Sequence, residues 1–266
     1  MGVDQLIRVT CPFDLLKEKY IDMVIDHRLN LEIGLNGAIL DTYSDDDFRR
    51  MSDLLSRHNL LVTIHGPFTD LPLGSVQSSI RKTVISIQKR AIDIAEILKA
   101  PQIVMHTGFD PKHHGTPDNS WIKRLKDSLL ELLDYAKRRA DGPDIALENT
   151  FEFDPTLHEA IFSQVEHEAL GFCFDLAHQV VFSKSTMERW LNGPCGERLK
   201  ELHLHDNHGE SDEHLAVGQG CLDFDALFNW ITTHGKRPVL TIEAHNERAV
   251  LPSLENVTRL ANKWGV

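Results

Sequence analysis

Three side chains of the kinds that bind transition metals lie close together in the stretch LKELHLHDNHGESDEHLAVGQG, residues 199–220. His203 stands in its apolar, strand-like first part, and Asp212 and His214 stand in the polar loop that follows. Imidazole combined with carboxylate favours Zn, Mn, Co or Fe over Ca. This stretch therefore predicts part of a metal site, and elements elsewhere in the chain must supply the remaining ligands.

Short apolar segments alternate with amphipathic helical segments along the whole chain. Strands that alternate with helices predict a parallel sheet, and eight such units predict an α/β fold closed into a (β/α)8 TIM barrel. We expect one domain over residues 1–266. An open doubly wound sheet would normally carry a Gly-rich turn after its first strand, and TCPFD has none. The predicted strands are 6–12, 31–36, 61–67, 102–108, 144–150, 171–178, 199–207 and 238–246, and the predicted helices are 13–26, 45–58, 78–99, 121–139, 156–167, 186–190, 224–234 and 254–264.

The polar residues at the ends of these strands indicate where the site lies. In a (β/α)8 barrel the catalytic groups stand at the carboxyl ends of the strands. A buried carboxylate or imidazole is costly there unless it is paired or bound to metal. Any one of them alone would be interpreted as a hydrogen-bonded core or loop residue, but so many at one rim predict a metal centre. The residues are His65, His106, Glu148, Asp175, His178, His203, Asp212, His214 and Glu243.

Three further residues near the predicted rim leave alternatives open. We expect His205 to face the opposite way from His203 on the same strand, so that His203→Ala lowers metal affinity more than His205→Ala. Glu32 stands in the middle of a strand and either points into the barrel or forms a structural ion pair. Phe68 follows His65 and is either a base-stacking residue or a wall of a sugar pocket.

Composition and charge limit the classes of partner. The formal net charge of -12 disfavours non-specific attraction to nucleic acid or to anionic membranes. We find no apolar run long enough to span a bilayer and no secretion signal. The four cysteines are scattered without a CxxC pair, which predicts reduced thiols and a cytoplasmic protein.

In order and spacing, the segments IHGPFTDL, VMHTG, ALENT, FDLAH, HLHDN with DEHLAVGQG, and TIEAHN resemble the xylose isomerase-like TIM barrel superfamily. That superfamily joins sugar (phosphate) isomerases and epimerases with endonuclease IV, the abasic-site nuclease of AP endonuclease family 2. The resemblance implies one divalent ion on Glu148, Asp175, His203 and Glu243, with Glu148 and Glu243 also acting as the catalytic acid/base pair. Endonuclease IV adds five positions for a trinuclear zinc cluster, matched here by His65, His106, His178, Asp212 and His214.

The resemblance leaves three functions, of which we favour the first. A sugar isomerase or epimerase would bind one divalent ion, Zn or Mn, and act through glutamate-mediated proton transfer and a metal-stabilised enediolate. An endonuclease IV-like phosphodiesterase would bind up to three Zn ions and needs cations along a phosphate path. Only Lys112, Lys184 and Arg248 are such cations, in loops that are net acidic. A metal-bound barrel without turnover is the third. We therefore expect an enzyme with a small carbohydrate as substrate and nucleic acid as the less favoured partner, and a homo-oligomer is left open.

Overall fold

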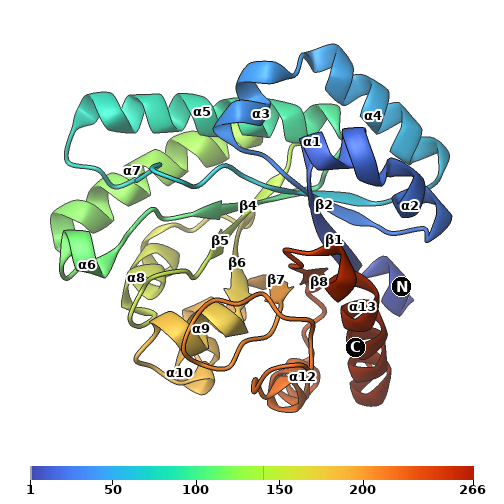
Figure 1. The fold of residues 1–266 in the computed structure, drawn as a ribbon. Coiled ribbons are helices and arrows are strands. Elements are labelled where there is room, and N and C mark those ends of the chain that lie inside the picture. Colours follow the sequence, from blue (N-terminus) through green and yellow to red (C-terminus); the bar gives the residue numbers. More distant parts are fainter. Residues whose placement is uncertain (1, 140) are drawn as a thin grey trace.

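The structure, a computed structural model, describes residues 2–139 and 141–266. Eight parallel strands form a closed barrel in the order β1-β2-β3-β4-β5-β6-β7-β8, and helices surround it (Figure 1). The pairing of β1 with β8 closes the ring. This confirms the predicted (β/α)8 fold. The strands are β1 Ile7–Pro12, β2 Leu31–Gly34, β3 Val62–His65, β4 Gln102–His106, β5 Asp144–Glu148, β6 Leu170–Asp175, β7 Leu199–Leu204 and β8 Val239–Ile242.

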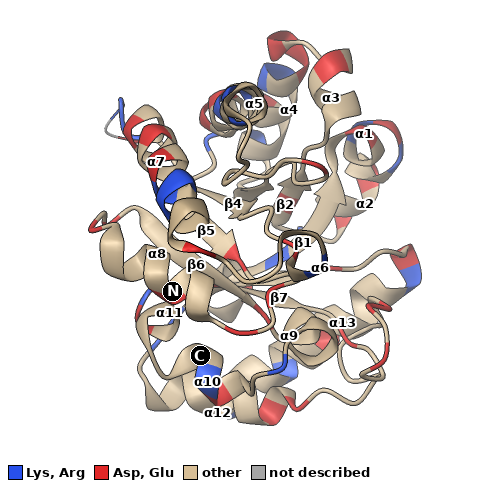
Figure 2. Cartoon of the chain, turned by 90° about the vertical axis from the view of Figure 1, so that its left-hand side faces the viewer, with Lys and Arg blue, Asp and Glu red and all other residues tan. Residues whose placement is uncertain are grey.

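Amphipathic helices cover the outside of the barrel. Their apolar faces pack against the strands in one large core, and the strands are buried on both sides, as parallel strands in this fold must be. On the outer helices acidic and basic residues are interspersed (Figure 2). The helices are η1 Val3–Gln5, α1 Phe13–Leu15, η2 Leu16–Tyr20, α2 Ile21–Asp26, α3 Gly37–Thr42, α4 Asp45–Arg57, α5 Ser78–Ile97, α6 Pro111–His114, α7 Asn119–Ala136, α8 Thr156–Gln164, α9 Leu176–Phe182, α10 Met187–Leu191, α11 Pro194–Glu197, α12 Phe224–Thr233 and α13 Glu247–Trp264.

Two predicted boundaries are wrong in ways that matter for the rim. The strand expected over 171–178 ends at Asp175, because the Asp175 carboxylate accepts a hydrogen bond from the His178 backbone N–H at 2.7 Å and so begins α9. The last helix begins at Glu247 rather than at 254. The Asn246 side chain caps it, and Pro252 is accommodated inside the helix.

The barrel interior below the rim is polar. Arg8, Glu32 and Glu201 are buried there. The side chains of Gln102 and Thr241 both donate hydrogen bonds to the Glu201 carboxyl group. Burial and the neighbouring charge of Glu32 raise the pKa of Glu201 to about 8, so this carboxyl group is mostly protonated at neutral pH. A layer of charged and polar groups therefore lies directly beneath the candidate site.

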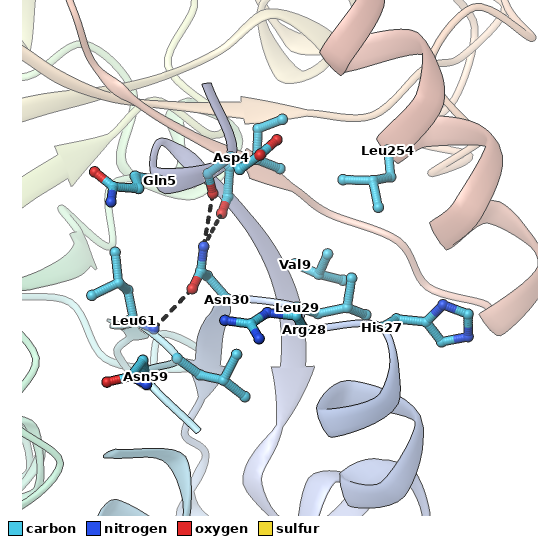
Figure 3. Close-up of a pocket in the computed structure, with 12 residues that line it drawn as sticks. Asp4, Gln5, Val9, His27, Arg28, Leu29, Asn30, Asn59, Leu61 and Leu254 are labelled. Atoms are coloured by element: carbon cyan, nitrogen blue, oxygen red, sulfur yellow. Dashed lines mark hydrogen bonds between the residues drawn. The ribbon is translucent and has the colours of Figure 1, made fainter. Parts of the chain in front are cut away.

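A large cavity of about 700 Å³ lies at the opposite, amino-terminal end of the strands (Figure 3). Asn30 crosses it, donating to the Asp4 carbonyl at 2.8 Å and accepting from the Leu61 N–H at 2.9 Å. These bonds tie β1, β2 and β3 together at their starts. Order at this end stabilises a barrel, whereas chemistry belongs to the other end. Among the described helices, none combines the length and apolar character that a membrane span requires.

Candidate metal centre

Glu148, at the end of β5, is the centre of the site. It is fully buried, and its two oxygens face different histidines: Oε2 lies 2.9 Å from His106 Nε2 and Oε1 lies 3.0 Å from His178 Nδ1. His203 Nδ1 lies 3.3 Å from Oε1, and His65 Nε2 lies 3.5 Å from Oε2. Strands β3, β4, β5 and β7 and helix α9 thus deliver five of the predicted residues to one place.

The remaining predicted residues form an adjoining group around Asp212. His178 Nε2 lies 3.5 Å and His214 Nε2 3.1 Å from Asp212 Oδ2. Asp175 lies 3.7 Å from His178 Nδ1, so His178 connects this group with Glu148. Glu243, at the end of β8, completes the set, with Oε2 3.6 Å from His203 Nδ1. The structure therefore brings all nine predicted residues together.

The loop after β7 is shaped by Asp206, which stands behind the site. Its carboxylate accepts hydrogen bonds from the N–H groups of Gly218 and Gly220, both at 2.9 Å, and of Leu222 at 3.2 Å. Its backbone forms a bridge with Leu215. A side chain at Gly220 would collide with Asp206 and Asn207, so this close approach requires glycine. Asp206 thereby folds the loop back on itself and holds Asp212 and His214 over the barrel.

Backbone carbonyls fix the orientation of three rim histidines. His65 Nδ1 lies 3.1 Å from the Gly66 carbonyl, and His214 Nδ1 lies 3.2 Å from the Glu243 carbonyl. A carbonyl can only accept, so Nδ1 carries a proton in both rings, and in the neutral ring the Nε2 lone pair faces the site. His178 Nδ1 likewise lies 3.1 Å from the Asn149 carbonyl, with Nε2 toward Asp212. Such anchoring is characteristic of metal-binding histidines.

The charges of the site are strongly coupled. Burial by itself would raise the pKa of Glu148, but His203 and His106 hold that pKa well below its usual range. Burial would likewise lower the pKa values of His178 and His203. The charge of Asp175 raises the pKa of His178 well above the ordinary value instead, and Cys173, Glu148 and Glu32 do the same for the pKa of His203. Without an ion, protons on the imidazoles therefore compensate the buried negative charge.

The residues fit a divalent ion. Among the described residues, several buried polar atoms of this site lack a hydrogen-bond partner, and such atoms cost free energy unless something else satisfies them. The set of carboxylate oxygens and imidazole nitrogens is the one that Zn, Mn, Co and Fe prefer. The unpartnered atoms include both carboxylate oxygens of Glu148, both ring nitrogens of His203, His205 Nδ1, Asp212 Oδ1 and Glu243 Oε2.

His205 was expected to face away from the site, and that prediction is wrong. Its Nε2 lies 3.0 Å from Asp175 Oδ2 and 3.7 Å from Glu243 Oε2, and its ring stacks on His214 at 3.8 Å. Side chains two residues apart on a strand point to the same face, so the HxH spacing of His203 and His205 indicated a shared direction. Asp175, His178, His205 and Glu243 form a compact group that could hold a metal ion.

Glu32 points into the barrel, which decides between the two alternatives left open by the sequence. It is fully buried on β2, and its Oε1 lies 3.2 Å from His203 Nε2. Phe68 covers the outer side of the site: 45% exposed, it packs on the His106 ring at 4.7 Å and edge-on against His65 at 5.6 Å. An exposed apolar ring beside the ligands can form one wall of a substrate pocket.

The chain matches the family described as "Xylose isomerase-like TIM barrel" over residues 20–264 and belongs to it. The uncharacterized protein MJ1311 of Methanocaldococcus jannaschii is 26% identical over 80% of this chain and 74% of its own length. Probable endonuclease 4 of Oceanobacillus iheyensis is 26% identical over 63% of this chain and 60% of its own. Fructoselysine 3-epimerase of Shigella flexneri is 27% identical over 61% of this chain and 59% of its own length.

Solved structures show the same fold over nearly the whole chain. The TTHB071 protein from Thermus thermophilus, solved after soaking with ZnCl2, is 26% identical with a TM-score of 0.79 and covers 97% of this chain and 98% of its own. A D-tagatose 3-epimerase-like protein is 22% identical with a TM-score of 0.77 and covers 97% of this chain and 98% of its own. Epimerases and endonuclease 4 proteins are thus both among the relatives, so the function has to be argued from the site.

Proposed function

We propose that this protein is a divalent-metal-dependent isomerase or epimerase that acts on a small sugar or a sugar-like keto or hydroxy compound. One observation carries the proposal. Glu148 from β5 and Glu243 from β8 approach the same ring nitrogen, His203 Nδ1, at 3.3 and 3.6 Å. Two carboxylates from strands separated in the barrel therefore face one small space, as an acid/base pair across a single carbon requires.

The protein residues would divide the work as follows. Glu148, Asp175, Glu243 and a histidine of β7 would hold the ion, which when bound would polarise a substrate carbonyl and make the neighbouring C–H more acidic. One glutamate would take the proton from that carbon. The same glutamate, or the one on the opposite side, would return it to the neighbouring carbon or to the other face.

The electrostatics of the site keep Glu148 in the ionised form, which both a metal ligand and a base require. The surrounding histidines hold the pKa of Glu148 well below its usual range, so Glu148 stays ionised although it is fully buried. A buried carboxylate is poorly solvated and can therefore accept a proton only from a substrate or side chain that the site itself places within reach. Phe68 beside His106 would form one wall of the space that holds the substrate.

The charge of the rim supports a small substrate rather than a polyanion. Between residues 206 and 222 the sequence contains four acidic residues and neither lysine nor arginine. Lys184, one of the three cations near the rim, lies over the Phe153 ring at 3.8 Å. A protein that follows a nucleic acid backbone needs a row of cations to neutralise the phosphates.

A zinc phosphodiesterase that acts on abasic DNA is the second candidate, and one observation favours it. The two oxygens of Glu148 face separate histidines, His106 and His178, as a carboxylate that bridges two ions would. The five positions that a multinuclear zinc centre would add are all directed at the site. Such a centre would serve an in-line displacement at phosphorus.

Metal content and a matched pair of activity assays test the proposal. We expect about one ion per chain, and conversion of at least one compound in a panel of ketoses, aldoses and hydroxy-keto acids. Glu243→Gln should abolish that conversion. Three zinc ions per chain, together with cleavage of an abasic-site duplex that disappears in Glu148→Gln, would establish the phosphodiesterase instead.

A further inference from the structure

We infer that Glu32 is a positioning residue for the metal site, which fixes the His203 ring by accepting the proton of its Nε2 so that Nδ1 faces the ion. This inference rests on the proposed metal-dependent function and adds a residue outside the nine predicted ligands. Glu32 comes from β2, a strand that contributes no predicted ligand to the rim.

The geometry places Glu32 on the far side of the His203 ring. Glu32 Oε1 lies 3.2 Å from His203 Nε2, an ion-pair contact in which Nε2 does not yet form a hydrogen bond, whereas His203 Nδ1 faces Glu148 Oε1 at 3.3 Å and Glu243 Oε2 at 3.6 Å. A neutral imidazole carries one proton, so an acceptor at Nε2 leaves a lone pair at Nδ1. Both side chains are fully buried, and water cannot replace the Glu32 contact.

In the other rim histidines a backbone carbonyl takes the place that the Glu32 carboxylate has beside His203. His65 and His214 anchor one ring nitrogen on a backbone carbonyl and direct the other at the site. His203 stands inside β7, one residue before the strand ends, and its outward nitrogen meets a carboxylate instead. A carboxylate that accepts from a metal-binding histidine fixes the ring and raises its basicity, so it strengthens the metal bond.

Glu32 is itself held in place by its surroundings. Thr10 on β1 approaches Glu32 Oε1 at 3.5 Å. Arg8, buried on the same strand one layer lower, contributes positive charge near it. Its second oxygen, Oε2, is buried and has no hydrogen-bond partner among the described residues. A buried anion with so few partners is costly unless a donor faces it, and His203 Nε2 lies 3.2 Å from its Oε1.

Zinc affinity of the whole chain tests the inference, measured by competition with a chromophoric chelator, with the metal content of each variant determined in parallel. Glu32→Gln keeps an acceptor but loses the charge, and we expect about ten-fold weaker zinc binding. Glu32→Leu loses the acceptor as well, and we expect roughly 100-fold weaker binding, within the range seen when such outer partners are removed. Glu152→Gln is the matched control. It alters a buried glutamate that accepts hydrogen bonds from Thr107 and from the Thr150 N–H, and we expect a change below about three-fold, under the range for outer partners of a metal ligand.

A second measurement uses the unaltered protein and so does not depend on a variant that folds. In the zinc-loaded protein labelled with 15N-histidine, long-range 1H–15N correlation spectra should show the His203 ring protonated at Nε2 and unprotonated at Nδ1. A His203 ring with its proton on Nδ1 would overturn the inference.

The outcomes separate the inference from the function on which it rests. If the unaltered protein binds zinc and Glu32→Gln and Glu32→Leu bind it equally well, Glu32 has no positioning role and the proposed function stands. If the variants lose one ion per chain instead of affinity, Glu32 is a direct ligand and the inference is wrong. If the unaltered protein binds no divalent metal, the proposed function fails and the inference fails with it.

Discussion

Removal of the metal should make the stability of this protein strongly dependent on pH. The folded protein without an ion holds protons on His178 and His203, whose pKa values neighbouring buried groups raise well above normal, and on Glu201, whose pKa is about 8. The pKa values of His65 and His214 are raised as well. The unfolded chain gives up these protons near pH 6.5 for histidine and near 4.3 for glutamate. Because the folded state binds more protons, its stability falls as the pH rises from 6.5 towards 8.

The magnitude follows from the number of protons. Each proton held only by the folded state contributes a slope of 2.303RT per pH unit, so the protons on His178, His203 and Glu201 alone give about 4 kcal/mol per unit, and His65 and His214 add to this slope. When an ion replaces the imidazole protons, only Glu201 contributes and the slope drops to about 1 kcal/mol per unit. At roughly 2–4 °C per kcal/mol for a chain of this size, the melting temperature should fall by about 8–16 °C per unit without metal and about 2–4 °C with it.

Thermal unfolding between pH 6.5 and 8, in excess chelator and with saturating zinc, measures both slopes. Glu201→Gln is the control, because it removes one proton from both conditions and should reduce both slopes by the same amount. The slope that remains without metal comes from the imidazoles, and zinc should still abolish it. Equal slopes with and without zinc would refute the assignment of the buried protons to the metal centre.

Three further predictions concern single residues. His205→Ala should weaken zinc binding at least as much as His203→Ala, because both rings approach Glu243; unchanged zinc affinity in His205→Ala would return the ligand role to His203 alone. Glu243→Gln should lower kcat by about 10²–10⁴-fold, the range of one lost acid/base group, and full activity would exclude Glu243 from proton transfer. Phe68→Ala should raise KM and leave kcat within a few-fold, as expected when only binding is lost; a large fall in kcat alone would contradict its place as a pocket wall.

The barrel was predictable because its pattern is repeated eight times. Each strand was found from its apolar run, and the rim followed from the rule that chemistry stands at strand ends. The nine candidate ligands converge because every one follows or ends a strand whose register the closed barrel fixes. For Glu148 and Glu243, position in the sequence was enough to locate the side chain in space.

The errors arose where local hydrogen bonds override periodicity. Asp175 ends β6 by capping α9, and an apolar run that continues past it, Leu176 and Ala177, gives no indication of this. The last helix was expected from residue 254, but the Asn246 cap starts it at Glu247, and Pro252 lies inside it. The contact between Glu32 and His203 joins strands β2 and β7 across the barrel. The spacing of residues along one sequence does not predict which side chains meet across the barrel interior.

Solvent deuterium exchange tests the central claim most directly. The metal-loaded protein is incubated in D2O with the panel of ketoses and hydroxy-keto acids, and deuterium at the carbon next to the carbonyl is followed by NMR. The account predicts incorporation into at least one compound, lost when the ion is chelated and lost in Glu243→Gln. If no compound takes up deuterium from the metal-loaded protein, proton transfer by the two glutamates is not what this site does.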